Sequence, residues 1–146
     1  MMNYKQFYDK ISGPLLDRID IQCEITPVPF KDISKAAPGE PSANIRERVI
    51  AARAIQIERY KDCKGIYCNA QMTERMIHRF AEPDADGINM LRMAMERLSL
   101  SARAYNRILK VARTIADLEG SEPVKTEHLA EAIGYRSLDR GDWAER

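Results

Sequence analysis

The stretch LSARAYNRILKVARTIADLEG, residues 100–120, decides the fold of this chain. Ser101 can cap a helix over residues 102–119, because a serine side chain accepts hydrogen bonds from the free N–H groups at a helix start. Gly120 can end this helix, because glycine readily adopts a left-handed backbone. Between them, apolar residues recur at helical spacing and form a stripe of Ala104, Ile108, Val111, Ala112, Ile115 and Leu118. The stretch therefore predicts a long helix with one face in the core.

Four further helical segments flank this long helix. Residues 43–60, 74–80, 87–98 and 127–133 each follow a residue that can cap a helix, and three of them carry a clear face at helical spacing. The expected caps are Ser42, Thr73, Asp86 and Thr126. The residues expected on the buried faces are Ile45, Val49, Ala52, Gln56, Leu91, Met95, Leu98, Leu129 and Ile133. The sequence therefore predicts a mainly α fold of about five helices.

Ahead of the helices lies one segment of a different kind, IDIQCEI over residues 19–25. Its apolar residues alternate with polar ones, which is typical of a half-buried β-strand. Residues 28–42 hold three of the seven prolines and are predicted to be a linker. A lone strand leaves its backbone groups unpaired, so the segment is expected to need a sheet from another chain or from a larger protein. An exposed strand edge of this kind also predicts self-association of the chain.

Composition excludes several classes of protein. The 146 residues fit one domain, or a small domain with an extra piece. The net charge of +1 disfavours a protein that binds nucleic acid through bulk electrostatic attraction. No apolar run approaches the roughly 18 residues that a membrane span needs, so no membrane partner is expected. The three cysteines are an odd number and too few for a disulfide framework, which favours a cytoplasmic protein with reduced thiols.

The chain lacks the motifs of a self-contained enzyme. It has neither a phosphate-binding P-loop nor a GxGxxG sequence. Cys63 and Cys68 have no histidine or third cysteine near them in sequence, so no zinc site is expected. The run at residues 84–87 resembles part of a calcium loop, but Met93 stands where the bidentate glutamate must be. No metal site is therefore expected, and nothing supports catalysis by this chain alone.

Two arginines near the start of the 102–119 helix stand out among the basic residues. Arg103 falls in the first turn, where the helix dipole disfavours a cation by about 0.3–1 kcal/mol. A guanidinium and the free N–H groups of a helix start together make an anion site, which Arg107, one turn further on, can extend. The alternative is that both arginines are solvated or paired with glutamates of neighbouring helices. Position alone favours this alternative.

Arg18 stands between the turn LLD, residues 15–17, and the predicted strand. A long cation at the end of a sheet edge is well placed to reach outward, as an arginine finger reaches the phosphate bound by a neighbouring subunit. The alternative is an ordinary ion pair with Asp17 or Asp20. Position alone again favours the alternative.

Several long runs together resemble one protein family. The runs are ISGPLLDRID (residues 11–20), IRERV (45–49) before Ala51-Ala52-Arg53, NAQM (69–72), LSARAY followed by RILKVARTIADL (100–118), and YRSLDR (135–140). They resemble the C-terminal part of Mg-chelatase-like AAA+ ATPases of the ComM (YifB) type. The resemblance extends over about residues 11–140.

The resemblance implies a division of the chain into three parts. Residues 1–27 would be the end of an AAA+ core, with the arginine-finger turn and the last core strand. Residues 28–42 would be a linker, and residues 43–146 the helical lid.

The resemblance also implies roles for the three arginines. Arg18 would be the finger that completes the nucleotide site of a neighbouring subunit in trans. Arg103 would be the sensor-2 residue, which contacts the nucleotide from the lid, and Arg107 would extend this contact. For the full-length protein the family implies ATP and Mg²⁺, a hexameric ring of AAA+ subunits, and DNA as the molecule remodelled. Its activity would be branch migration in transformation and recombination.

The sequence departs from the family pattern in what it lacks. The Walker A, Walker B and sensor-1 segments of family members are absent, and Lys10 stands where arginine is expected. The chain is therefore expected neither to hydrolyse ATP alone nor to bind it tightly. Two other interpretations stay open. One is a stand-alone helical module that binds nucleic acid or a protein through its arginine-rich helices, which the net charge of +1 weakens. The other is an oligomerisation piece.

Overall fold

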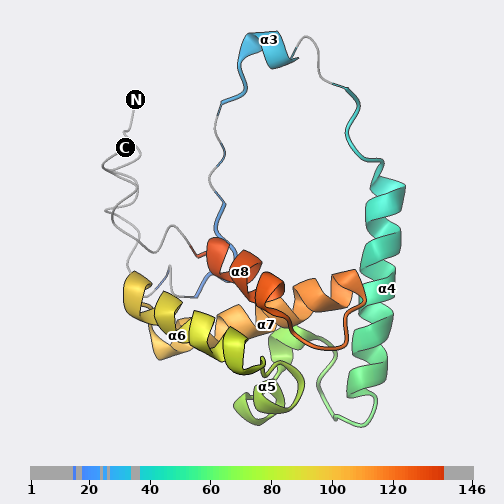
Figure 1. Ribbon diagram of the computed structural model, residues 1–146. Coiled ribbons are helices and arrows are strands. Elements are labelled where there is room, and N and C mark those ends of the chain that lie inside the picture. The colour runs from blue at the N-terminus through green and yellow to red at the C-terminus, as the bar shows by residue number, and fades with distance from the viewer. Residues whose placement is uncertain (1–14, 16–17, 24, 26, 34–36, 137–146) are drawn as a thin grey trace.

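The computed structural model describes residues 15, 18–23, 25, 27–33 and 37–136, and in these residues the fold is helical (Figure 1). The elements are α3 (Phe30–Ile33), α4 (Ser42–Tyr60), the 3-10 helix η1 (Asn69–Gln71), α5 (Glu74–Phe80), α6 (Ala85–Leu98), α7 (Ala102–Glu119) and α8 (Thr126–Gly134). The five predicted helices are α4 to α8, with bounds that differ from the prediction by no more than two residues. The predicted mainly α class is confirmed. Within the described ranges, no helix is both long and apolar enough to cross a membrane.

The strand predicted over residues 19–25 is not formed in the described part of that segment. The chain there has no regular secondary structure, and Glu24 lies outside the described residues. A strand is stabilised by hydrogen bonds to a neighbouring strand, and the described residues contain none. Ile19, Ile21 and Ile25 are accordingly 39%, 52% and 86% exposed. Self-association through this apolar edge stays a prediction.

The cap of α7 and its end follow the sequence signals. Ser101 accepts a hydrogen bond from the backbone N–H of Ala104 at 3.2 Å, as predicted. Gly120 ends the helix with a φ of 73°, in the left-handed region that glycine tolerates. Thr73 likewise caps α5, as predicted, by accepting from the N–H of Met76 at 3.4 Å.

The other three predicted caps are wrong by one or two residues. Asp84, and not Asp86, caps α6, by accepting from the N–H of Gly87 at 2.8 Å. Asp86 lies in the first turn, where a carboxylate is also favourable to the helix dipole. Ser42 and Thr126 are the first residues of α4 and α8 instead of their caps. A short helix, α3, lies inside the predicted linker.

The core is organised around α7, which contacts α4, α5, η1 and α8. Its buried residues form two adjacent rows at four-residue steps, one of Ala104, Ile108, Ala112 and Ala116, and one of Leu109, Arg113 and Asp117. The predicted stripe is therefore only partly right. Leu118 is 45% exposed, and Val111 and Ile115 are half-buried. The buried arc is wider and rotated because helices cover α7 on more than one side.

The remaining residues that were predicted to lie in the core differ in how deeply they are buried. Those buried are Ala52, Gln56, Leu91 and Leu129, and those half-buried are Met95, Leu98 and Ile133. Ile45 and Val49 are 43% and 46% exposed, which corrects the prediction. Both lie in the N-terminal half of α4, which extends beyond the other helices (Figure 1).

Gly87, in the first turn of α6, is packed too closely to accept a side chain. A Cβ at this position would lie 2.6 Å from the Cβ of Pro83 and 2.8 Å from the Cδ1 of Leu129. The Pro83 ring cannot turn aside, so Gly87→Ala is expected to lower the free energy of unfolding by about 1–3 kcal/mol. Urea denaturation followed by circular dichroism measures the change.

Gly134→Ala in α8 is the matched control for this variant. No atom lies within 4 Å of its added Cβ, so the better helix propensity of alanine acts alone and stability is expected to hold or rise by up to about 1 kcal/mol. An equal change in the free energy of unfolding for Gly87→Ala and Gly134→Ala would show that close packing is not the reason for glycine at position 87.

Candidate functional site

Arg103 lies in the first turn of α7 with its side chain exposed. The next residue, Ala104, is fully buried, so the helix presents Arg103 on the side away from the core. In the part of the chain that the structure describes, Arg103 has no ion pair or side-chain hydrogen bond. The structure therefore places an exposed guanidinium at the start of an 18-residue helix, with no side-chain partner among the described residues.

Arg107, one turn further along α7, is engaged in an ion pair. Its Nη1 donates to Oδ1 of Asp20, and the two side chains are 31% and 51% exposed. Arg107 is therefore paired in the structure, but with an aspartate instead of a neighbouring helix's glutamate. Asp20 neutralises the charge that was expected to extend an anion site around Arg103.

Arg18 is exposed and follows a turn. Its backbone N–H donates to the carbonyl of Leu15 at 3.0 Å, which closes the turn that the sequence predicts. Asp20, one of its two expected ion-pair partners, contacts Arg107 instead. The other expected partner, Asp17, lies outside the described residues.

The segment after Arg18 is attached to the chain that follows α8. Arg136 is 1% exposed, and its Nη1 donates to the carbonyl of Ile19 at 2.6 Å. The backbone N–H of Gln22 donates to the carbonyl of Tyr135 at 2.9 Å. In the sequence, Tyr135 and Arg136 stand out only as part of YRSLDR (residues 135–140), one of the runs that carry the family resemblance. No periodicity reveals their contacts, because Arg136 follows the last turn of α8 and its acceptor is 117 residues away.

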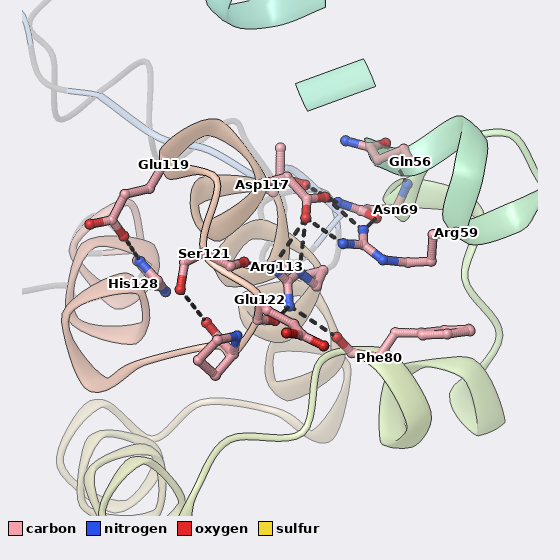
Figure 2. A network of polar contacts seen from close by, with 12 residues as sticks. Gln56, Arg59, Asn69, Phe80, Arg113, Asp117, Glu119, Ser121, Glu122 and His128 are labelled. Carbon is pink, nitrogen blue, oxygen red and sulfur yellow. Dashed lines mark hydrogen bonds and ion pairs between the residues drawn. The ribbon is translucent and has the colours of Figure 1, made fainter. Parts of the chain in front are cut away.

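A second polar cluster, which the sequence patterns did not predict, is buried between α4, η1 and α7 (Figure 2). The carboxylate of Asp117, with no exposed side-chain surface, accepts hydrogen bonds from the guanidinium of Arg59 at 2.7 and 2.5 Å. Asn69 donates its Nδ2 at 2.8 Å, and Arg113 its Nε at 3.1 Å. These four residues form the Asp117 cluster, which joins three elements through one carboxylate.

Arg113 extends the Asp117 cluster to the loop after α7. Its Nη1 and Nη2 each donate at 2.6 Å, to the carbonyls of Glu122 and Ser121 (Figure 2). Burial lowers the pKa of Arg113, whereas the hydrogen bond to Asp117 raises the pKa of Arg59. Guanidinium stays protonated in proteins, so two cations share this carboxylate. These side chains are turned toward one another and toward backbone carbonyls, which makes the cluster a structural one.

One group of possible metal ligands occurs among the described residues, formed by Glu119, Glu127 and His128. The buried His128 accepts the N–H of Lys125 on Nδ1 at 3.0 Å, so its ring proton is on Nε2, which contacts Glu119. This hydrogen bond lowers the pKa of Glu119. The ammonium of Lys125 lies 3.3 Å from Glu127 and 3.9 Å from Glu119. Because Lys125 already supplies the positive charge, the group is a contact between α7 and α8 and does not fit a metal ion.

Comparison with known proteins reveals clear relatives. Competence protein ComM of Haemophilus influenzae is 40% identical over 136 residues, which are 92% of this chain and 26% of that protein. The uncharacterized protein YifB of Escherichia coli is 39% identical over the same shares. An uncharacterized protein of Mycobacterium tuberculosis is 33% identical over 132 residues, 90% of this chain and 26% of its own length. The chain thus spans about a quarter of the length of these relatives.

The family described as magnesium chelatase, subunit ChlI C-terminal, matches residues 39–136. This range contains all of α4 to α8, which is the helical part of the fold. The family resemblance inferred from the sequence runs is therefore confirmed. The chain belongs to the family of the magnesium chelatase subunit ChlI C-terminal domain, as a relative of ComM and YifB.

Proposed function

We propose that this chain acts as the helical lid of a ComM-type AAA+ ATPase, with Arg103 contacting the nucleotide phosphates. The observation that carries the proposal is that the guanidinium of Arg103, in the first turn of α7, is exposed and has no ion pair within the described ranges. The helix dipole makes a cation at this position unfavourable. A bound anion reverses this effect, because the guanidinium and the backbone N–H groups then both donate hydrogen bonds to the same ligand. The family to which α4–α8 belong supports this interpretation.

In the same proposal, Arg18 is the arginine finger that reaches the nucleotide of a neighbouring subunit. Its exposure and its place directly after a closed turn support an outward reach. Arg107 is not a nucleotide ligand in this scheme, since it is paired with Asp20.

For the whole protein we propose ATP hydrolysis with Mg²⁺ in a hexameric ring of subunits, coupled to DNA branch migration in transformation and recombination. The support is the similarity to a relative named as a competence protein. This chain contributes nucleotide contacts and no hydrolytic site, because its sequence has no P-loop. The free thiols of Cys23, Cys63 and Cys68 support a cytoplasmic location.

A chimera tests the role of Arg103. In the chimera this chain replaces the segment of Haemophilus influenzae ComM that it matches, so that the rest of ComM supplies the segments that this chain lacks. Arg103→Ala is expected to raise the KM for ATP about 10- to 100-fold, because a hydrogen bond to a charged group contributes about 1.5–3 kcal/mol. Steady-state ATPase assays and titration with a fluorescent ATP analogue measure the change.

Arg92→Ala is the matched control in this experiment. Arg92 is an exposed arginine of α6 whose partner is Glu96 at 3.4 Å, and its loss is expected to leave the KM unchanged. If Arg103→Ala also leaves the KM unchanged, Arg103 does not contact the nucleotide. A folded chimera that fails to bind ATP would contradict the proposal that this chain is a ComM-type lid.

A further inference from the structure

Two arginines of the helical domain, one in α7 and one just after α8, contact the segment of Arg18. Arg107 reaches it from α7 through Asp20, and Arg136 reaches it from the end of α8 through the carbonyl of Ile19. We propose that Arg107 and Arg136 are positioning residues that fix this segment to the lid, so that Arg18 and Arg103 move as one unit. The proposal rests on the roles proposed above for Arg18 and Arg103.

Arg136 is the rigid part of this attachment. Its side chain is buried, and a buried guanidinium is costly unless acceptors satisfy it. One of its acceptors is the carbonyl of Ile19, 2.6 Å away, in the residue directly after Arg18. A carbonyl oxygen moves only with its backbone, so this bond fixes the main chain beside Arg18. The bond from the Gln22 N–H to the Tyr135 carbonyl, at 2.9 Å, fixes the same stretch a second time.

Arg107 connects the segment of Arg18 to α7, the helix that carries the proposed nucleotide contact of Arg103. It lies one turn after Arg103 in α7, so its pair with Asp20 joins the helix of Arg103 to the segment of Arg18. The two side chains are 31% and 51% exposed, and such pairs are weak alone. The buried bond of Arg136 therefore holds the segment, and the Arg107 pair sets its orientation relative to α7. A lid that moves on nucleotide contact then carries Arg18 with it.

Hydrogen exchange at the Gln22 amide, measured by NMR on the 146-residue chain, tests the attachment without any ATPase activity. Arg107→Gln and Asp20→Asn are each expected to raise the exchange rate about two- to fivefold, in keeping with a part-exposed pair. Arg107→Lys keeps the charge and is expected to stay close to the unmodified rate. Arg92→Gln removes a comparable exposed pair elsewhere and is expected to change nothing. An unchanged Gln22 rate in both Arg107→Gln and Asp20→Asn would overturn the proposal.

Arg136→Gln tests the buried bond in the same measurement. Glutamine is too short to reach the Ile19 carbonyl, so the Gln22 rate is expected to rise about tenfold or more. The buried amide of Leu109 in α7 reports global opening and is expected to keep its rate. Equal acceleration at Gln22 and Leu109 would show that Arg136 holds the whole fold together and would overturn its positioning role.

The ComM chimera separates this inference from the proposed function. Arg107→Gln is expected to lower kcat about two- to fivefold and to leave the KM for ATP unchanged. The reason is that Arg103 is intact in this variant and only the orientation of Arg18 is less well fixed. An unchanged kcat with faster Gln22 exchange would overturn the coupling. If Gln22 exchange responds as expected but Arg18→Ala leaves ATP hydrolysis intact, the attachment stands and the finger role fails.

Discussion

Asp117→Ala is expected to destabilise this chain by about 3–5 kcal/mol, the usual cost of breaking a buried ion pair on one side. The substitution leaves the buried Arg113 without its counter-ion and removes the shared acceptor of Arg59 and Asn69. Because these partners belong to α4, η1 and α7, removing the carboxylate weakens the contacts among all three elements. Urea denaturation followed by circular dichroism measures it as a lower midpoint.

Leu118→Ala provides the matched control, one position further along the same helix. Leu118 is 45% exposed, so its truncation is expected to change stability by no more than about 0.5 kcal/mol. Asp117→Asn keeps the shape of the side chain and removes its charge, and we expect it to fall between these two variants. A midpoint for Asp117→Ala equal to that of Leu118→Ala would mean that the Asp117 cluster does not hold the helices together.

Arg18→Ala in the ComM chimera is expected to lower kcat for ATP hydrolysis about a thousandfold or more, the effect typical of losing an arginine finger. In the finger role proposed for Arg18, the guanidinium stabilises negative charge that develops on the phosphate in the transition state. The KM for ATP is expected to change little, since in the proposed scheme ATP binding depends on the P-loop of the ComM part and on Arg103. Single-turnover and steady-state ATPase assays measure the change, and Arg92→Ala again serves as the control.

Mixing two inactive variants tests whether Arg18 acts on a neighbouring subunit. One variant is the Arg18→Ala chimera, and the other is a chimera that keeps Arg18 and lacks the P-loop lysine of the ComM part. Mixed rings are expected to regain part of the activity, because an intact Arg18 then meets the intact P-loop of its neighbour. No recovery on mixing would contradict action in trans, and full activity of Arg18→Ala alone would contradict the finger role itself.

The helices were predictable from the sequence because their signals are local. The bounds of α7 follow from Ser101, which supplies a hydrogen-bond acceptor, and from Gly120, which adopts a φ of 73°. The caps of α4, α6 and α8 were missed by one or two residues. For α6 the reason is visible, because Asp84 and Asp86 are both carboxylates at the helix start and only the folded backbone selects between them.

Two predictions failed because the sequence does not show which segments pack against the residues concerned. The alternation over residues 19–25 is typical of a strand, but a strand requires a partner that the described residues do not contain. The apolar stripe of α7 omitted Arg113 and Asp117, because hydrophobic periodicity takes account of apolar residues only. Their spacing of four residues and their place beside Leu109 were the available signal.

The sequence by itself determined the five helices, their order and the family, because periodicity, helix ends and long matching runs are properties of neighbouring residues. Only the tertiary structure decided which arginines form contacts and which are exposed, as Arg18 and Arg103 are. Arg107 meets Asp20 across 87 residues of chain, and Arg136 meets the carbonyl of Ile19 across 117 residues. Contacts over such separations depend on how the helices pack, and that packing leaves Arg103 exposed at the start of α7.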